Sequence, residues 1–125
     1  MILARKIQSV AFDRPGGERC AKSKGRPIDL DHLSEQTFGD RALGEEVLRL
    51  FCTQVQQSAA SLKHASREER HFLAHALKGS ARGLGAMDLA DVAARLESDR
   101  DNDQALGELF TEIERVQEFC ASILR

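Results

Sequence analysis

A single histidine among cationic side chains, with a glycine shortly after it, is the feature of this sequence best suited to chemistry. His75 is followed by Lys78 at i+3 and Gly79 at i+4. Arg82 lies at i+7 and His71 at i−4. On an α-helix, residues three and four apart are neighbours, so these side chains share one region of surface. Neutral imidazole is a nucleophile, and most of it is neutral at pH 7 because its ordinary pKa is about 6.5. Nearby cations keep the ring neutral and then offset the charge of a phosphoryl group bound to it.

The helix that carries this histidine is predicted from clear signals at both ends. Residues 66–69 (Ser-Arg-Glu-Glu) form a capping-box pattern, and Gly85 provides the left-handed residue that ends a helix. At 100° per residue, His75, Lys78 and Arg82 fall on the solvent face. The side assigned to the core carries Phe72, Leu73, Ala76, Leu77, Ser80 and Leu84.

Gly79 is interpreted as a flat spot beside the reactive ring. Glycine inside a helix costs about 1 kcal/mol relative to alanine, so its presence needs a reason. A partner's active site must come within bonding distance of His75, and a residue without a side chain permits that approach.

Polar residues that precede apolar, helix-spaced runs indicate where helices start. The first predicted helix is short, and the four that follow are longer and amphipathic. Short loops make sequential helices antiparallel, and the apolar faces must cover one another. The expected fold is therefore all-α, an antiparallel up-down four-helix bundle with a short leading helix. The predicted caps are Asp29, Asp40 (after the turn at Phe38 and Gly39), Ser66, Asp88, and either Asp101 or Asn102.

A broad apolar arc is predicted on the long helix that follows Asp40, which implies contact with more than one neighbour. An alternative for the residues that widen this arc is an exposed seam through which two chains dimerise. The arc is centred on Leu43, Val47, Leu50, Phe51, Gln54, Ser58 and Leu62, and it is widened by Leu48, Cys52 and Val55.

The 125 residues are enough for one domain, predicted to span residues 27–125 after a basic extension and linker at 1–26. Residues 1–12 have apolar side chains at helical spacing and are a candidate short helix. Residues 1–27 carry seven basic and two acidic side chains, whereas the remainder carries eleven and eighteen. The extension has one aromatic residue and no motif that reads bases, so we interpret it as solvated and expect no nucleic-acid partner.

Cysteine usage and hydropathy exclude several classes of protein. Cys20, Cys52 and Cys120 form no even framework, which favours buried thiols in a reducing compartment over disulfides. No apolar run approaches the roughly 20 residues that span a bilayer. Charges at Arg5 and Lys6 interrupt the first apolar stretch, which is untypical of a secretory signal. We expect a cytoplasmic protein without a membrane partner.

The spacing of His71 and His75 is also that of two metal ligands on one helix face. No glutamate follows His71, and Lys78 and Arg82 would repel a cation. We therefore expect no metal site and no bound cofactor. His71 is interpreted instead as a solvated neighbour that, with Arg82, belongs to a partner-binding face.

The segment from His75 to Ala81, followed by Leu84-Gly85-Ala86, resembles the signature of histidine-containing phosphotransfer (HPt) domains. Residues 28–30, 38–40 and 89–97 resemble the first helix, the turn and a later helix of that family, so the resemblance covers about residues 27–125. HPt domains are four-helix modules of multistep two-component phosphorelays.

The resemblance implies a role for each motif residue. His75 would accept a phosphoryl group on Nε2 from a receiver-domain aspartate, Lys78 would contact that group, and Gly79 would open the approach. The partners would be response-regulator receiver domains or a hybrid histidine kinase, and Mg²⁺ would belong to the receiver. The chain lacks a nucleotide-binding Gly-rich loop, so we expect a monomeric phosphocarrier without kinase activity. The alternative is a bundle that docks on or inhibits a receiver or kinase without chemistry.

Overall fold

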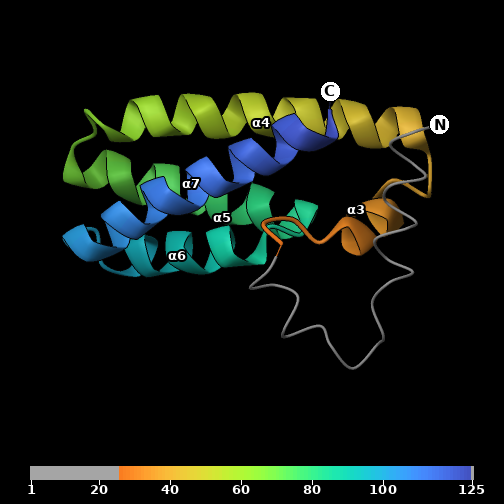
Figure 1. Ribbon diagram of the computed structural model, residues 1–125. Coiled ribbons are helices and arrows are strands. Elements are labelled where there is room, and N and C mark those ends of the chain that lie inside the picture. The colour runs from red at the N-terminus through yellow and green to blue at the C-terminus, as the bar shows by residue number, and fades with distance from the viewer. Residues whose placement is uncertain (1–25, 125) are drawn as a thin grey trace.

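The computed structural model describes residues 26–124, and all of its regular structure there is α-helical (Figure 1). This confirms the predicted all-α class for that part of the chain. The candidate helix at residues 1–12 and Cys20 lie outside the described residues. The helices are α3 (Leu30–Gln36), α4 (Arg41–Leu62), α5 (Arg67–Leu84), α6 (Met87–Ser98) and α7 (Asp103–Ile123).

Four long helices lie side by side and one short helix closes an end of the molecule. Helix α5 contacts α6, α6 contacts α7, α7 contacts α4, and α4 contacts α5. Figure 1 shows successive long helices running in opposite directions, and α3 lying beneath the start of α4. Helix α3 also contacts α5. The tightest pairing is α5 with α6, and it is the pairing that forms the candidate site.

Most helix starts are capped by the predicted side chains. Asp29 accepts from the amides of Asp31 (3.1 Å) and His32 (3.2 Å). Asp40 accepts from the Leu43 amide at 3.1 Å. Of the two candidates for α7, Asn102 is the cap, and it accepts from the Ala105 amide at 2.9 Å.

The prediction that Asp88 caps α6 is wrong. The N-cap is Ala86, and no side chain caps the helix there. The chain enters α6 directly from the end of α5, because the Ala86 amide donates to the Ala81 carbonyl at 2.8 Å. Asp88 therefore lies inside the first turn, where a carboxylate is still favoured by the helix dipole.

The apolar stripe of α4 is rotated from the one that was predicted. Leu43 and Leu50 are 41% and 65% exposed, whereas Leu48 and Val55 are fully buried. A seam through Leu48 and Val55 is thus unavailable to a second chain. The core residues of α4 are Leu48, Phe51, Val55 and Leu62.

The buried side of α5 also differs from the prediction, since Phe72 is 71% exposed and Ala76 is exposed. Of the six residues assigned to the core, only Leu77 is fully buried; Leu73, Ser80 and Leu84 are half-buried. The helix instead faces inward through Ala74, Leu77 and Ala81. Alanines let α5 and α6 approach closely. Helical spacing and hydrophobicity alone favour the larger Phe72 for the core over these small residues.

Candidate functional site

Helix α5, which carries the site, is held by hydrogen bonds at both ends. The capping box forms as predicted: the Glu69 amide donates to Ser66 Oγ at 3.2 Å, and the Ser66 amide donates to Glu69 Oε1 at 2.8 Å. Gly85 ends the helix with φ of 89°, in the left-handed region. The Asp29 amide donates to the Gly85 carbonyl at 2.8 Å, which ties this end to α3.

His75 stands on the surface of α5, and its side chain is 66% exposed, as expected. Its Nδ1 lies 2.6 Å from Oε2 of Glu97, which belongs to α6. An ionised carboxylate only accepts hydrogen bonds, so Nδ1 carries the proton. In the neutral ring, Nε2 then has the lone pair. The nucleophilic nitrogen is thereby assigned by a contact to the neighbouring helix.

Lys78 shares the same carboxylate. Its Nζ lies 2.6 Å from Glu97 Oε1, and the lysine side chain is 21% exposed. The expectation of a solvent-facing lysine is therefore wrong, because most of the side chain is buried and the ammonium is paired with a carboxylate of α6. The cation nearest to His75 is offset by Glu97, so the ring faces a neutralised pair rather than unopposed positive charge.

Glu97 is ionised throughout the physiological range. Hydrogen bonds from Lys78 and then from His75 lower its pKa from 4.5 to about 2, against a smaller desolvation effect. Glu97 is 17% exposed, and this partial burial strengthens both contacts relative to water. The charge on this carboxylate is what holds the two α5 side chains in place.

The sequence reasoning missed Glu97. It lies 22 positions after His75, and periodicity within one helix says nothing about which residue of the next helix faces it. One signal was present: Glu97 directly follows Leu96, which is fully buried, so it lies at the edge of the apolar stripe of α6.

His71 is held by the same residue through its backbone. Its Nδ1 lies 3.0 Å from the Glu97 carbonyl oxygen, and the side chain is partly buried. Its ring meets the ring of Phe72 edge-on, with centroids 5.6 Å apart. The interpretation of His71 as merely solvated is therefore wrong, because the ring is oriented by α6.

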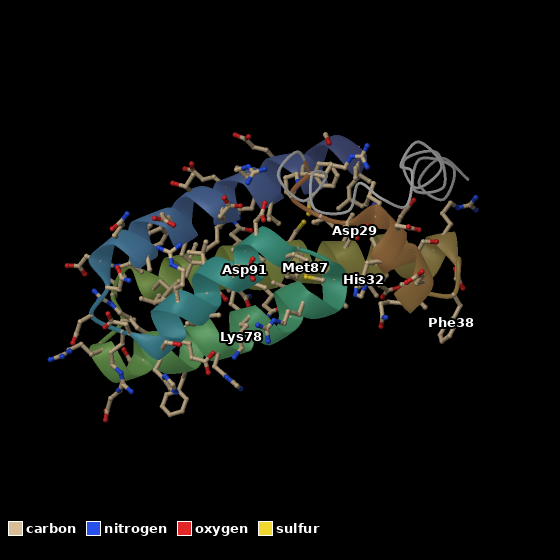
Figure 2. All side chains as sticks on the ribbon, turned by 90° about the horizontal axis from the view of Figure 1, so that it is seen from below. Asp29, His32, Phe38, Lys78, Met87 and Asp91 are labelled. Carbon is tan, nitrogen blue, oxygen red and sulfur yellow. The ribbon has the colours of Figure 1, made fainter. Side chains whose placement is uncertain are left out.

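The face of α5 beyond His75 is open. A Cβ built on Gly79 or on Gly83 would meet no described atom within 4 Å. Arg82 is exposed and forms no ion pair with any side chain of residues 26–124. Figure 2 shows Lys78 on the flank of α5, with Phe38 projecting from the far end of the molecule.

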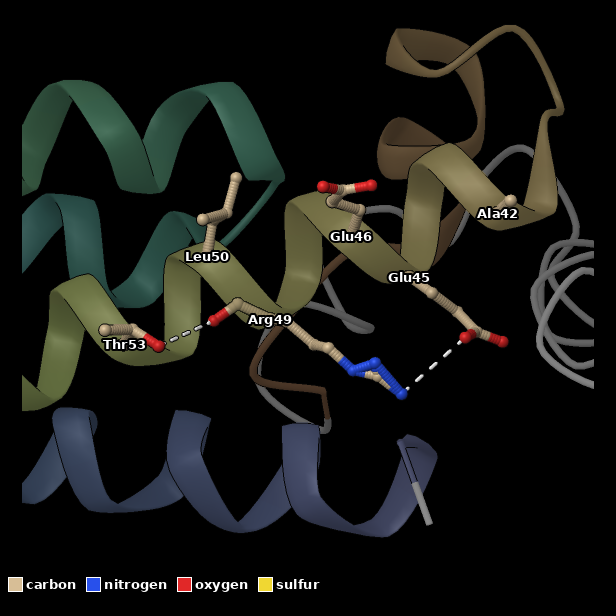
Figure 3. A pocket seen from close by; sticks show the side chains of 6 residues that line it. All are labelled: Ala42, Glu45, Glu46, Arg49, Leu50 and Thr53. Atoms are coloured by element: carbon tan, nitrogen blue, oxygen red, sulfur yellow. Dashed lines mark hydrogen bonds and ion pairs between the residues drawn. The ribbon is translucent and has the colours of Figure 1, made fainter.

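A groove of about 380 Å³ adjoins this open face between α3, α4 and α5. Its floor includes Ser80, whose Oγ accepts a hydrogen bond from Gln54 Nε2 at 2.8 Å. Leu50 borders it, and in Figure 3 the Leu50 side chain leaves α4 on the opposite side from Arg49. A separate depression, the one drawn in Figure 3, is lined by α4 residues alone and includes both partners of the Arg49–Glu45 ion pair at 3.7 Å.

Residues 26–124 contain no group of three or more histidine, cysteine or acidic side chains placed to hold a metal ion. Every helix described is too short or too polar to cross a bilayer.

The described residues thus form a helical bundle that carries an exposed histidine whose ring is oriented by the neighbouring helix. The family model described as the Hpt domain matches residues 46–121, and the chain belongs to this family. Hpt domains carry out histidine phosphotransfer in two-component phosphorelays and have no kinase activity. They interact with receiver domains and histidine kinases. No curated protein and no solved structure matched the chain.

Proposed function

We propose that this protein is a phosphocarrier whose His75 accepts a phosphoryl group on Nε2 from a receiver-domain aspartyl phosphate and passes it to another receiver. The observation that carries this proposal is the 2.6 Å contact between His75 Nδ1 and Glu97, on a ring that is otherwise exposed. That contact leaves Nε2 as the nucleophile and points the reactive atom away from α6.

The transfer step follows from this arrangement. The Nε2 lone pair attacks phosphorus, a P–N bond forms, and the P–O bond to the aspartate breaks with the carboxylate as leaving group. The Nδ1 proton stays in its hydrogen bond to Glu97, so no base is needed. The ring becomes positively charged in this step, and the Glu97 carboxylate is the group that offsets the charge. Mg²⁺, carried by the receiver, would stabilise the phosphoryl oxygens there.

Lys78 is proposed to contact the phosphoryl group, with Glu97 as its alternative partner. Its ammonium and His75 Nδ1 bind the two oxygens of one carboxylate, so the ammonium lies near the Nδ1 edge of the ring. When three phosphoryl oxygens arrive at Nε2, the ammonium has a second anion within a short swing of its flexible stem.

The receiver is proposed to dock over the open face of α5. Gly79 and Gly83 present bare backbone there, and exposed Phe72 and Leu50 offer apolar contacts on either side. Arg82 contributes a cation that no described side chain neutralises, which suits the acidic site of a phosphorylated receiver.

The acting unit is proposed to be residues 27–125 as a monomeric antiparallel four-helix bundle, with α3 as its leading helix. Burial of the hydrophobic Ile28, Leu30 and Leu33 supports a domain that begins upstream of the family match. The basic residues before it are not required by the proposed chemistry.

The test is phosphoryl transfer from a phosphorylated receiver to the wild type and to His75→Gln. The wild type should acquire an acid-labile, alkali-stable label, and His75→Gln should acquire none while still binding the receiver. His64→Gln is the matched control, because His64 is exposed on the loop after α4. A label retained in His75→Gln would overturn the assignment. Binding without any label in the wild type would favour a docking module without chemistry.

A further inference from the structure

The two histidines of α5 form a pair with the same orientation. His71 donates from Nδ1 to the Glu97 carbonyl at 3.0 Å, and His75 donates from Nδ1 to the Glu97 carboxylate at 2.6 Å. Nδ1 is therefore the donor in each ring, which leaves Nε2 as the nitrogen that can offer a lone pair when the ring is neutral, and the two residues lie one helical turn apart. The phosphotransfer chemistry uses only one of them.

We propose that His71 and His75 together bind a divalent transition-metal ion of the zinc class through their Nε2 atoms. Imidazole nitrogens are ligands that such ions prefer, at about 2.0–2.1 Å. Residues at i and i+4 have Cβ atoms about 5–6 Å apart, which lets both rings reach one ion. Water fills the remaining positions, because residues 26–124 supply no cluster of three ligands here.

The hydrogen bonds to Glu97 are of the kind that accompanies metal ligation. A ligating histidine usually donates its other ring N–H to a carboxylate or a backbone carbonyl, which fixes the tautomer and strengthens the ligand. Here one histidine has the carbonyl and the other has the carboxylate. Both rings are thus prepared before an ion arrives.

Repulsion by neighbouring cations, which the sequence suggested, is largely removed by ion pairs. Lys78 is paired with Glu97 at 2.6 Å. Arg67 is paired with Asp101, and Arg70 lies 3.6 Å from Asp103. Arg82 alone among the cations of α5 has no such partner in the described residues, and it lies two turns from His75.

Metal binding would compete with phosphorylation, and this part of the inference rests on the proposed function. An Nε2 lone pair donated to a metal ion is not available to attack phosphorus. Occupancy by the ion would therefore hold the protein in a state that accepts no phosphoryl group.

The binding test is a titration of the full chain with Zn²⁺ to about 1 mM, followed by the imidazole ¹⁵N shifts. One equivalent should bind and move the Nε2 resonances of His71 and His75. Either His71→Gln or His75→Gln should weaken binding at least tenfold, whereas His64→Gln should not change it. Circular dichroism would verify that each variant is folded. Absence of Nε2 shifts, or equal affinity in His71→Gln, would overturn the site. Zinc that binds without moving the Nε2 resonances of the two histidines would be held elsewhere, for example by a cysteine.

The competition test uses phosphoramidate, a small-molecule donor that needs no receiver. Saturating Zn²⁺ should slow labelling of the wild type at least tenfold and leave labelling of His71→Gln nearly unchanged. Undiminished labelling of zinc-saturated wild type would overturn the competition. A wild type that binds zinc but is never labelled, even without zinc, would refute the phosphocarrier function and leave the metal site standing.

Discussion

Glu97 of α6 accepts a hydrogen bond at 2.6 Å from Nδ1 of His75 on α5, and so selects which nitrogen of that ring is nucleophilic. The relationship joins two helices, and it makes the reactivity of α5 dependent on how α6 packs against it. Helices α5 and α6 make the most extensive contact in the bundle, so the packing of these two helices determines where the carboxylate lies relative to the ring.

Removal of this carboxylate should slow the chemistry at His75 without unfolding the protein. In Glu97→Ala, nothing fixes the proton on Nδ1 and nothing offsets the charge of the phosphorylated ring. We expect phosphoramidate labelling to slow about tenfold, equivalent to about 1.4 kcal/mol. Imidazole ¹⁵N shifts should report a mixed tautomer. Glu108→Ala, which removes an acid paired with Arg95 on the other side of α6, is the control and should react normally. Unchanged rate and tautomer in Glu97→Ala would contradict the assigned role.

The low pKa of Glu97 predicts a specific acid dependence of stability. The pKa is lowered from 4.5 to about 2 in the folded protein, so the folded state favours the ionised form. Its stabilising effect is complete above about pH 4.5 and is lost as the pH falls toward 2. The free energy of unfolding of the wild type, measured with denaturant between pH 2 and 6, should show this loss. Its dependence on pH should be weaker in Glu97→Gln. Glu114→Gln, with the same charge change at an exposed position of α7, should retain the wild-type slope.

The features that the sequence predicts correctly are those determined by residues that are adjacent in the chain. The capping box at Ser66, the left-handed Gly85 and the exposure of His75 each depend on a few adjacent residues. The features that were missed depend on contacts between helices. Glu97 became part of the site, and Lys78 became half-buried, only because α6 packs against α5.

The error in the buried face of α5 has the same origin. Phe72 is the largest apolar side chain of that helix, yet it is exposed to solvent, whereas Ala74 and Ala81 are fully buried. Hydrophobicity alone favours the larger residue for the core. The space between two closely packed helices admits only the smaller ones, and that constraint comes from α6.

Gly85 should be intolerant of a side chain, for two separable reasons. Its φ of 89° disfavours any L-residue by about 1–2 kcal/mol, and a Cβ would lie 2.9 Å from the Asp29 carbonyl oxygen. We expect Gly85→Ala to lower the free energy of unfolding by more than about 2 kcal/mol. Gly39 has φ of 71° and no described atom within 4 Å of its would-be Cβ, so Gly39→Ala should show the backbone cost alone. Equal losses in urea denaturation would mean that contact with Asp29 is unimportant.

Gly79 should show opposite effects of substitution on stability and on transfer between proteins. A Cβ there would meet no described atom within 4 Å, so Gly79→Ala should stabilise the helix by about 0.5–1 kcal/mol. Glycine at such a position lowers the stability of the helix relative to alanine, and no contact within the bundle requires it. Under the proposed function, the compensating gain is the approach of a partner to His75. Gly79→Leu should slow transfer from a phosphorylated receiver at least tenfold and leave phosphoramidate labelling nearly unchanged, because the small donor needs no docking surface.

Gly107 of α7 provides the matched comparison for that experiment. It is exposed, lies within a helix and has the same open surroundings, but it belongs to a different helix from His75. Gly107→Ala should give the same gain in stability, and Gly107→Leu should transfer at the wild-type rate. If both leucine variants slow receiver transfer alike, the effect is a general one of added bulk. If neither does, the receiver does not approach across Gly79, and the docking face must lie on another side of His75.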